Sequence, residues 1–258
     1  MSEDKSGGGA SFATKARYKT PENFFPVVVD DFFNDPEALV DYGKSLPSNP
    51  SSNGYWPGKR TKNLWRIDNI LCSTIILKIL SCYYDVDYIT LSWDSSEMSF
   101  QEIPRFSENK NDIINKGWIH RDDKNWQLAG LIYLTPNIDP DSGTSLYDLK
   151  SKFNNKDHGS SSKFELFKDG NIDEEEYIKD HIKQEEDFFE KVRFQNIFNR
   201  LIMYDTCEWH RANSYYNGDG KDARFTLSFF IGGISIIPLE RIKNSEYETI
   251  IKDQIGKK

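Results

Sequence analysis

Residues 117–134 restrict the fold more than any other stretch, because a His-x-Asp pair there directly precedes an apolar run. Side chains of an extended segment alternate between its two faces, so Trp118, His120 and Asp122 share one face. An imidazole and a carboxylate at this spacing can bind the same ion. Asp123 is the competing carboxylate, but it points to the opposite face, which favours Asp122.

A second histidine, His210, follows another strand-like run much later in the chain. With the His-x-Asp pair it gives two histidines and one carboxylate, the facial triad of non-haem Fe(II) oxygenases. On the next strand-like segment, Arg224, Thr226 and Ser228 share a polar face, and the residues between them are apolar. A guanidinium binds a carboxylate through two hydrogen bonds, so this strand predicts an acidic ligand beside the metal.

The remaining patterns predict helices followed by many strands. Asp35 and Pro36 predict a helix start, because aspartate caps the first turn and proline suits its first position. Apolar residues at helical spacing predict a second helix over residues 69–83 that packs on a sheet. This order, without strand–helix alternation, predicts a mainly β fold with flanking helices (α+β), as a sandwich or barrel. The predicted strands are residues 24–30, 88–93, 97–103, 127–134, 144–147, 195–206 and 224–231.

The same patterns predict one domain over residues 21–240, between two tails. Residues 1–20 are rich in glycine, serine and lysine, which predicts a disordered tail, and residues 241–258 form a second tail. Residues 148–194 interrupt the strand pattern with a polar loop and an acidic helical segment. We expect this segment to be an insertion on the rim of the domain, with its charges in solvent.

Three further groups of residues could be mistaken for parts of the site or belong to it. Residues 48–58 predict a loop. Trp56 within it and Arg60 just after it indicate a packed surface loop, with a substrate contact as the alternative. His158 and His181 lie in the polar insertion and are expected to be bystanders. Cys207 is close to His210 in sequence, but three ligands without sulfur already suffice for the metal.

Composition argues against several classes of function. The net charge is −8 and the sequence pI is about 5.2, which argues against a nucleic-acid partner. No run of about 18 apolar residues is present, so no membrane span is expected. The first residues lack the apolar core of a signal peptide, and the three cysteines do not form a CxxC pattern. A reducing, cytoplasmic location is therefore expected.

From His120 through His210 to Arg224, the chain resembles the Fe(II)/2-oxoglutarate-dependent dioxygenases, and most closely their prolyl-hydroxylase-like branch. Residues 131–136 are similar to the strand that follows the family's His-x-Asp motif. Residues 141–147 are similar to its Gly-Gly-x-Leu strand. The resemblance therefore covers the motifs on both sides of the predicted site.

The match extends over residues 24–235, with two departures from the family pattern. The segment from His210 to Arg224 is longer than is common in the family, with residues 215–220 inserted. Ser142 stands where the family has the first of its two glycines. Neither departure touches a predicted metal ligand.

The resemblance implies a jelly-roll core, also called a double-stranded β-helix, that binds Fe(II), the co-substrate 2-oxoglutarate and O2. The site residues that it implies are the iron ligands His120, Asp122 and His210 and the 2-oxoglutarate contacts Arg224, Tyr133 and Thr226. The implied reaction releases succinate and CO2. Relatives that halogenate lack the carboxylate that Asp122 supplies, so hydroxylation is the expected outcome.

The expected substrate is a peptide or protein side chain or a small metabolite, and the sequence fixes neither this choice nor the oligomeric state. Two other kinds of protein remain open. One is a Zn-dependent hydrolase or isomerase with the same His/Asp/His site, which would leave Arg224 without a purpose near the metal. The other is a non-catalytic jelly-roll binding module with a vestigial site.

Overall fold

The computed structural model describes residues 18–19, 24–85, 89–151, 161–169, 172–216 and 223–238. Within these ranges the chain is mostly β-structure with a few helices, and the strands pair antiparallel. The α-helices are α1 (Pro36–Ser45), α2 (Leu64–Ile67), α3 (Asn69–Leu80), α4 (Ser161–Asp169) and α5 (Glu174–Glu186). The strands are β1 (Tyr18–Lys19), β2 (Val27–Val29), β3 (Ser48–Pro50), β4 (Lys59–Thr61), β5 (Ile89–Ser92), β6 (Ser95–Ile103), β7 (Leu128–Tyr133), β8 (Thr144–Leu149), β9 (Phe188–Phe194), β10 (Leu201–Asp205), β11 (Trp209–Ala212), β12 (Arg224–Gly232) and β13 (Ser235–Pro238).

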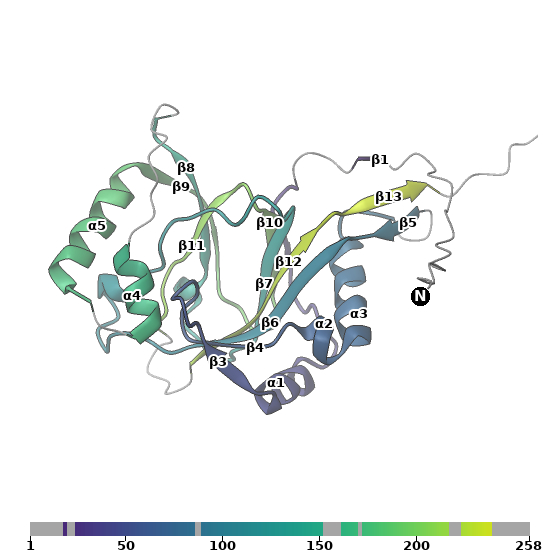
Figure 1. Cartoon of the computed structure of the whole chain (residues 1–258), viewed down its shortest axis with the longest axis horizontal. Coiled ribbons are helices and arrows are strands. Elements are labelled where there is room, and N and C mark those ends of the chain that lie inside the picture. Colours follow the sequence, from purple (N-terminus) through teal and green to yellow (C-terminus); the bar gives the residue numbers. More distant parts are fainter. Residues whose placement is uncertain are drawn as a thin grey trace, which may run out of the picture.

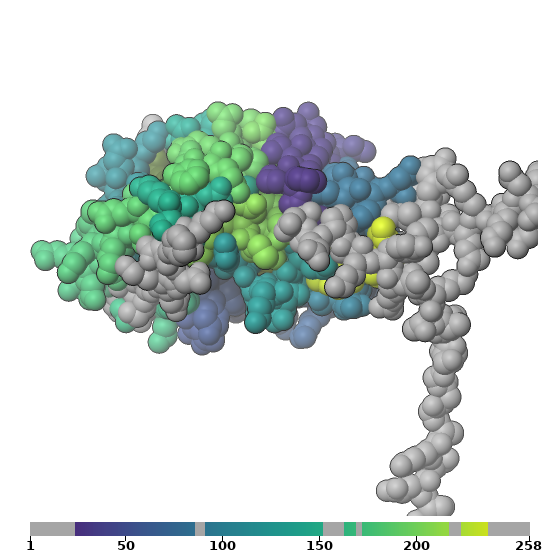
Figure 2. Space-filling model, turned by 90° about the horizontal axis from the view of Figure 1, so that it is seen from above, coloured from purple at the N-terminus to yellow at the C-terminus, as the bar shows by residue number. Residues whose placement is uncertain are grey.

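The described strands form three sheets (Figure 1). The large sheet has seven strands in the order β2-β10-β7-β12-β6-β4-β3, and a three-stranded sheet has the order β11-β8-β9. A further sheet, β1-β13-β5, lies at the end of the molecule away from α4 and α5. The space-filling view shows the α5 segment, in green, at the other end (Figure 2).

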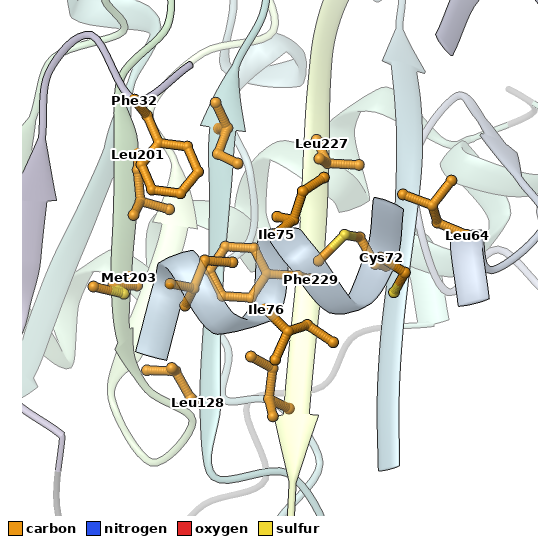
Figure 3. Close-up of a cluster of buried hydrophobic side chains, with 14 of the residues drawn as sticks. Phe32, Leu64, Cys72, Ile75, Ile76, Leu128, Leu201, Met203, Leu227 and Phe229 are labelled. Atoms are coloured by element: carbon orange, nitrogen blue, oxygen red, sulfur yellow. The ribbon is translucent and has the colours of Figure 1, made fainter. Parts of the chain in front are cut away.

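One face of the large sheet is covered by α1, α2 and α3, and the main hydrophobic core lies between them. Helix α3 crosses the strands, and Cys72, Ile75 and Ile76 on its inner side pack in one cluster with Leu227 and Phe229 of β12 (Figure 3). Burial of such side chains contributes most of the favourable free energy of folding. None of the described helices has both the length and the apolar composition needed to cross a bilayer.

The helices expected at Asp35–Pro36 and over residues 69–83 are confirmed, and the acidic helical segment of the insertion is α5. Asp35 caps α1 by accepting a hydrogen bond from the amide of Ala38 at 3.0 Å, and Pro36 occupies its first turn. The helix expected over residues 69–83 is α3, which is slightly shorter and packs on the large sheet as expected.

The opposite face of the large sheet is polar along β12 and borders a cavity. Arg224, Thr226 and Ser228 line this cavity, whereas the residues that alternate with them belong to the main core. The alternation expected for this strand is therefore observed. Thr144 and His210, from the three-stranded sheet, line the same cavity, so it lies between the two sheets.

The expected loop over residues 48–58 begins with a strand. Ser48–Pro50 forms β3, which pairs with β4 at the edge of the large sheet. A short polar edge strand shows no apolar alternation, so the sequence gives no sign of it. A proline is tolerated there because one side of an edge strand makes no ladder hydrogen bonds.

The expected insertion, residues 148–194, contains a strand of the three-stranded sheet. Residues Phe188–Phe194 form β9, which pairs with β8. The phenylalanines at its two ends are buried, but charged side chains between them are exposed or half-buried. This run of charge conceals the strand in the sequence.

The tails are only partly within the described residues. Tyr18–Lys19 lies in the expected disordered tail but forms β1, which pairs with β13. A strand of two residues is too short to show an alternating pattern in the sequence. Residues 1–17, His158 and the expected tail 241–258 lie outside the described residues. The single domain predicted over residues 21–240 stays a prediction.

Candidate active site

His120, Asp122 and His210 come together in the cavity between the two sheets. One ligand atom from each lies within 4.8 Å of the others, and this is the one such cluster among the described residues. The Nε2 atoms of His120 and His210 lie 3.9 Å and 3.5 Å from oxygens of the Asp122 carboxylate. Asp122 Oδ2 is buried without a hydrogen-bond partner. A buried carboxylate oxygen without a hydrogen bond is costly unless a cation neutralises it, so the cluster fits a divalent metal.

Backbone carbonyls orient both histidines. Nδ1 of His120 donates to the carbonyl of Trp118 at 2.8 Å, and Nδ1 of His210 donates to that of Glu208 at 3.0 Å. A proton on Nδ1 leaves the lone pair on Nε2, the nitrogen that faces Asp122. Burial, and then nearby positive charge, holds the pKa of His120 well below its ordinary value. The imidazole is therefore neutral, as metal binding requires.

The residues that could compete with this cluster lie apart from it. Asp123 is exposed and accepts a hydrogen bond from the amide of Asn125 at 2.9 Å, which fixes a turn after the motif. Cys207 is a free, exposed thiol. His181 is fully buried in α5, where Nε2 lies 3.2 Å from the carbonyl oxygen of Gly117. None of the three belongs to the cluster.

The His-x-Asp segment is extended and is held from both sides. On one side His120 forms an isolated antiparallel bridge with His210, with N···O distances of 3.0 Å and 2.9 Å. Backbone groups of adjacent residues in an extended chain point in opposite directions, so Ile119 faces the other side. There the Gln184 amide donates to the Ile119 carbonyl at 2.7 Å and accepts from its N–H at 2.9 Å. A side chain thus replaces a neighbouring strand.

The helix that supplies Gln184 was expected to be solvated. Tyr177, His181 and Gln184 form a buried stripe on α5 at helical spacing, and only its other faces carry exposed charge. Glu185 adds an ion pair of 2.6 Å with Arg211 of β11. A stripe made of tyrosine, histidine and glutamine has little apolar contrast, so the sequence pattern does not reveal it.

Replacement of Gln184 by alanine is expected to destabilise the fold and weaken metal binding. Both buried backbone groups of Ile119 lose their partner, which costs about 2 kcal/mol or more in the free energy of unfolding. The misplaced motif should lower the affinity for a divalent metal by about tenfold or more. Denaturant unfolding and metal titration measure the two effects, with Lys183→Ala on the exposed side of α5 as the control. Unchanged metal affinity in Gln184→Ala would show that the helix supports the fold alone.

Arg224 lies in the same cavity and has no acidic partner among the described residues. Arg224 is only 2% exposed, and its Nε and Nη2 atoms have no hydrogen-bond partner. These two nitrogens form one edge of the guanidinium fork, the edge that binds a carboxylate through two parallel hydrogen bonds. A buried guanidinium with two free donors is costly, so the position fits an anionic ligand.

Tyr133 and Thr226 lie beside Arg224 on adjacent strands, where they face each other directly in the β7–β12 register. The Arg224 guanidinium carbon is 5.5 Å from the centre of the Tyr133 ring. The Tyr133 hydroxyl donates to Thr144 Oγ1 at 3.0 Å. Thr144 and Thr226 both line the cavity, so the hydroxyls near the arginine come from both sheets.

The cavity has a volume of about 530 Å³, and the loop before β4 and helix α4 form part of its wall. The two segments touch closely, because a Cβ built at Gly54 would lie 2.0 Å from the carbonyl oxygen of Phe164. Gly54 also has a φ of +69°, which other residues rarely adopt. The Tyr55 and Phe164 rings pack edge to face with centroids 5.6 Å apart.

Arg60 and Lys163 are cavity residues that the sequence analysis did not assign to the site. Burial lowers the pKa of Arg60 to about 10 and that of Lys163 to about 8, against the opposing effect of the Asp122 carboxylate on both. Arg60 belongs to the stretch interpreted as a packed surface loop, and Lys163 to the expected insertion. The aromatic residues within residues 48–58 and the two cations directly after them were the sequence signal for the alternative interpretation, a substrate contact.

Two buried tyrosines of the cavity were also missed. The Tyr204 ring lies 4.8 Å from the His210 ring, and Tyr204 comes from β10. Tyr215 is 5% exposed and donates its amide to the carbonyl of Asn115 at 2.6 Å. It is the first residue of the extra segment between His210 and Arg224, so the longer spacing contributes a cavity residue. The other departure, Ser142, hydrogen-bonds the Asp139 carbonyl at 2.6 Å.

A family model matches residues 13–231, which is most of the chain. The chain belongs to DUF6445, a family of unknown function. No curated protein matches this DUF6445 chain by sequence. The family description names no activity, so the chemistry has to be inferred from the site.

Solved structures similar to this DUF6445 chain include the following three. HygX from Streptomyces hygroscopicus, with nickel and 2-oxoglutarate bound, is 10% identical and has a TM-score of 0.45, with 80% of this chain and 82% of that chain covered. A prolyl hydroxylase from Trichoplax adhaerens, in complex with a hypoxia inducible factor peptide fragment, is 14% identical, with a TM-score of 0.43 and 81% and 83% covered. A prolyl-4-hydroxylase from Pseudomonas putida is 12% identical, with a TM-score of 0.40 and 80% and 91% covered. Two of the three are named as prolyl hydroxylases. The function of this chain is therefore argued from its site.

Proposed function

We propose that the chain is an Fe(II)- and 2-oxoglutarate-dependent oxygenase that hydroxylates an organic substrate and releases succinate and CO2. The observation that carries the proposal is the buried Arg224, with two unpaired donors, in the same cavity as the metal-binding cluster. A metal cluster alone fits many reactions. A metal cluster with a buried carboxylate-binding arginine fits a co-substrate that chelates metal at one end and ends in a carboxylate at the other.

Each side chain has a defined part in this proposal. His120, Asp122 and His210 would hold the metal through one face and leave its other positions open. Bound Fe(II) with 2-oxoglutarate supplies the activation of O2, which protein side chains cannot provide. Arg224 would bind the distal carboxylate of 2-oxoglutarate, with the Thr226 hydroxyl beside it. The remaining cavity walls would exclude water and hold the substrate near the metal.

Tyr133 has a more indirect part than the sequence suggested. Its hydroxyl already donates to Thr144, and its ring lies against the Arg224 guanidinium. We propose that it fixes the arginine and orients Thr144, whose side chain lines the cavity. The Tyr133 hydroxyl can still accept a hydrogen bond, so direct contact with 2-oxoglutarate stays part of the proposal.

The same proposal extends to the architecture. We infer that the large sheet and the β11-β8-β9 sheet form a double-stranded β-helix, with residues 21–240 as one domain. Antiparallel pairing throughout the described strands, and a cavity lined from both sheets, support this inference.

The two rival functions account for fewer of these observations. A zinc hydrolase would use the His120, Asp122 and His210 cluster but gives no reason for a buried, unpaired Arg224. A non-catalytic binding module gives no reason for two histidines whose Nε2 atoms both face one unpaired carboxylate.

The test is an anaerobic titration of the metal-free chain with Fe(II) and then 2-oxoglutarate. A visible metal-to-ligand charge-transfer band is expected only when both are present. Oxygen should then convert 2-oxoglutarate to succinate, which can be quantified directly. Iron that binds without producing the band on addition of 2-oxoglutarate would contradict the proposal and favour a hydrolase or a binding module.

A further inference from the structure

A second group of unpaired donors faces the cavity from the side of the loop before β4. We propose that Arg60 and Lys163 form an anion-binding position there, and that the substrate is a small molecule that places a carboxylate or phosphate on them. The inference rests on the proposed oxygenase function, because it names the substrate class of that same site. It narrows the expected range of substrates, which included peptide or protein side chains and small metabolites of any charge.

Arg60 is held in place but keeps a free donor. Its Nη2 donates to Gln101 Oε1 at 3.1 Å, and the Gln101 amide donates in turn to the carbonyl of Pro57 at 2.8 Å. The guanidinium carbon lies 5.0 Å from the centre of the Trp56 ring. Arg60 Nε and the Trp56 indole Nε1 are both buried without a hydrogen-bond partner. Two fixed donors without an acceptor fit an oxyanion.

Lys163 supplies a second positive charge from helix α4. Its ammonium lies 5.6 Å and 5.9 Å from the ring centres of Phe164 and Phe167. Within the described residues it forms no ion pair, and the same holds for Arg60. Both cations line the same cavity as His120.

The proposed iron and co-substrate leave these two charges uncompensated. The charges of Fe(II) and the 2-oxoglutarate dianion cancel. Those of Asp122 and Arg224 also cancel, as do those of Asp123 and Arg121, which line the same cavity. Glu97 on β6 is a further cavity acid that acts on Arg60, but it forms no ion pair with it. Glu97 balances only one of the two positive charges of Arg60 and Lys163. The remaining positive charge would be neutralised by an anionic substrate.

The shape of the cavity favours a small molecule over an extended peptide. The loop and α4 touch at Gly54 and Phe164, where even a Cβ has no room. This contact joins the two segments of the cavity wall that lie beside the two cations. The volume of about 530 Å³ also has to accommodate 2-oxoglutarate, which leaves space for a substrate of modest size.

The test is a binding experiment with matched acids and neutral analogues. The full chain, loaded anaerobically with Fe(II) and 2-oxoglutarate, is titrated calorimetrically with phenylacetate, N-acetylphenylalanine and phenyl phosphate. The same titrations use phenylacetamide, N-acetylphenylalanine amide and phenol. At least one acid is expected to bind about tenfold or more tightly than its neutral analogue. Tryptophan fluorescence provides a second readout, because Trp56 lies against Arg60.

Variants locate the effect within the cavity. Arg60→Gln and Lys163→Gln should each weaken binding of the acid by about tenfold, with 2-oxoglutarate affinity within about threefold of the parent. Arg60→Lys should recover part of the binding. Arg121→Gln is the matched control, because Arg121 also lines the cavity and lies 4.5 Å from the Trp209 ring but is exposed. It should leave both affinities unchanged.

Three results would overturn the inference. No acid in the panel binds, or acids and neutral analogues bind equally. Alternatively, Arg60→Gln weakens 2-oxoglutarate binding as severely as Arg224→Ala, which would make Arg60 an anchor for the co-substrate. Failure of the proposed function looks different: the charge-transfer band is missing in the parent chain, while the Arg60-dependent preference for acids persists.

Discussion

Replacement of His210 by alanine is expected to lower the affinity for Fe(II) by more than about 100-fold, which exceeds the usual effect of losing a group that only supports a ligand. The two remaining ligands, His120 and Asp122, are too few to occupy one face of the metal's coordination octahedron. The charge-transfer band and succinate formation should both disappear. Anaerobic equilibrium dialysis with metal analysis measures the affinity, and thermal unfolding without metal verifies that the variant is folded.

Asp123→Asn is the matched control for the metal ligands. Asp123 follows Asp122 directly and also lines the cavity, but it is exposed and serves as an acceptor for the amide of Asn125. Asparagine keeps that acceptor, so iron affinity should stay at the parent value. Parent-like iron binding in His210→Ala, or loss of binding in Asp123→Asn, would contradict the assigned ligand set.

Replacement of Arg224 by alanine is expected to leave iron binding intact and to weaken 2-oxoglutarate binding by at least about 30-fold. The loss of one partner of a buried, hydrogen-bonded charge pair costs about 2 kcal/mol or more, which corresponds to that ratio. Arg224→Lys should give an intermediate affinity, because lysine keeps the charge but not the paired donors. Titration of the charge-transfer band with 2-oxoglutarate measures each affinity.

The ligand-free stability of Arg224→Met separates binding from structure. The parent guanidinium is buried with two unpaired donors, so an apolar side chain of similar length should preserve or raise the free energy of unfolding. The gain in melting temperature on addition of 2-oxoglutarate should disappear. Arg200→Met is the control, because Arg200 pairs with Asp30 instead of facing the cavity. A large loss of ligand-free stability in Arg224→Met would show that Arg224 has a structural partner.

The sequence was informative wherever side-chain alternation or a cap carries the structure. His120 and Asp122 share a face because they are two residues apart, and the polar stripe from Arg224 to Ser228 faces the cavity for the same reason. Asp35 caps a helix through its own carboxylate. Each of these features depends on neighbours in the chain, so a local pattern is enough to predict it.

Features that depend on distant contacts were not predictable in this way. Gln184 supports Ile119 across 65 positions of sequence, and no local pattern relates the two. Lys163 lies in a polar stretch that resembles any solvated surface. Arg60 borders the cavity because β4 pairs at the edge of the large sheet, and that strand is three residues long. Charge and aromatic content identify such residues only after the fold has brought them together.

Residues 161–169 and 172–186 carry the two helices to which the proposals assign different roles. Helix α4 places Lys163 in the cavity, and helix α5 places Gln184 on the His-x-Asp segment. An evolutionary or engineered exchange of this stretch for a different substrate would therefore also alter how firmly the iron is retained. Under the proposed function, substrate range would be coupled to metal occupancy. Variants selected for a new substrate should therefore be screened for iron content at the same time.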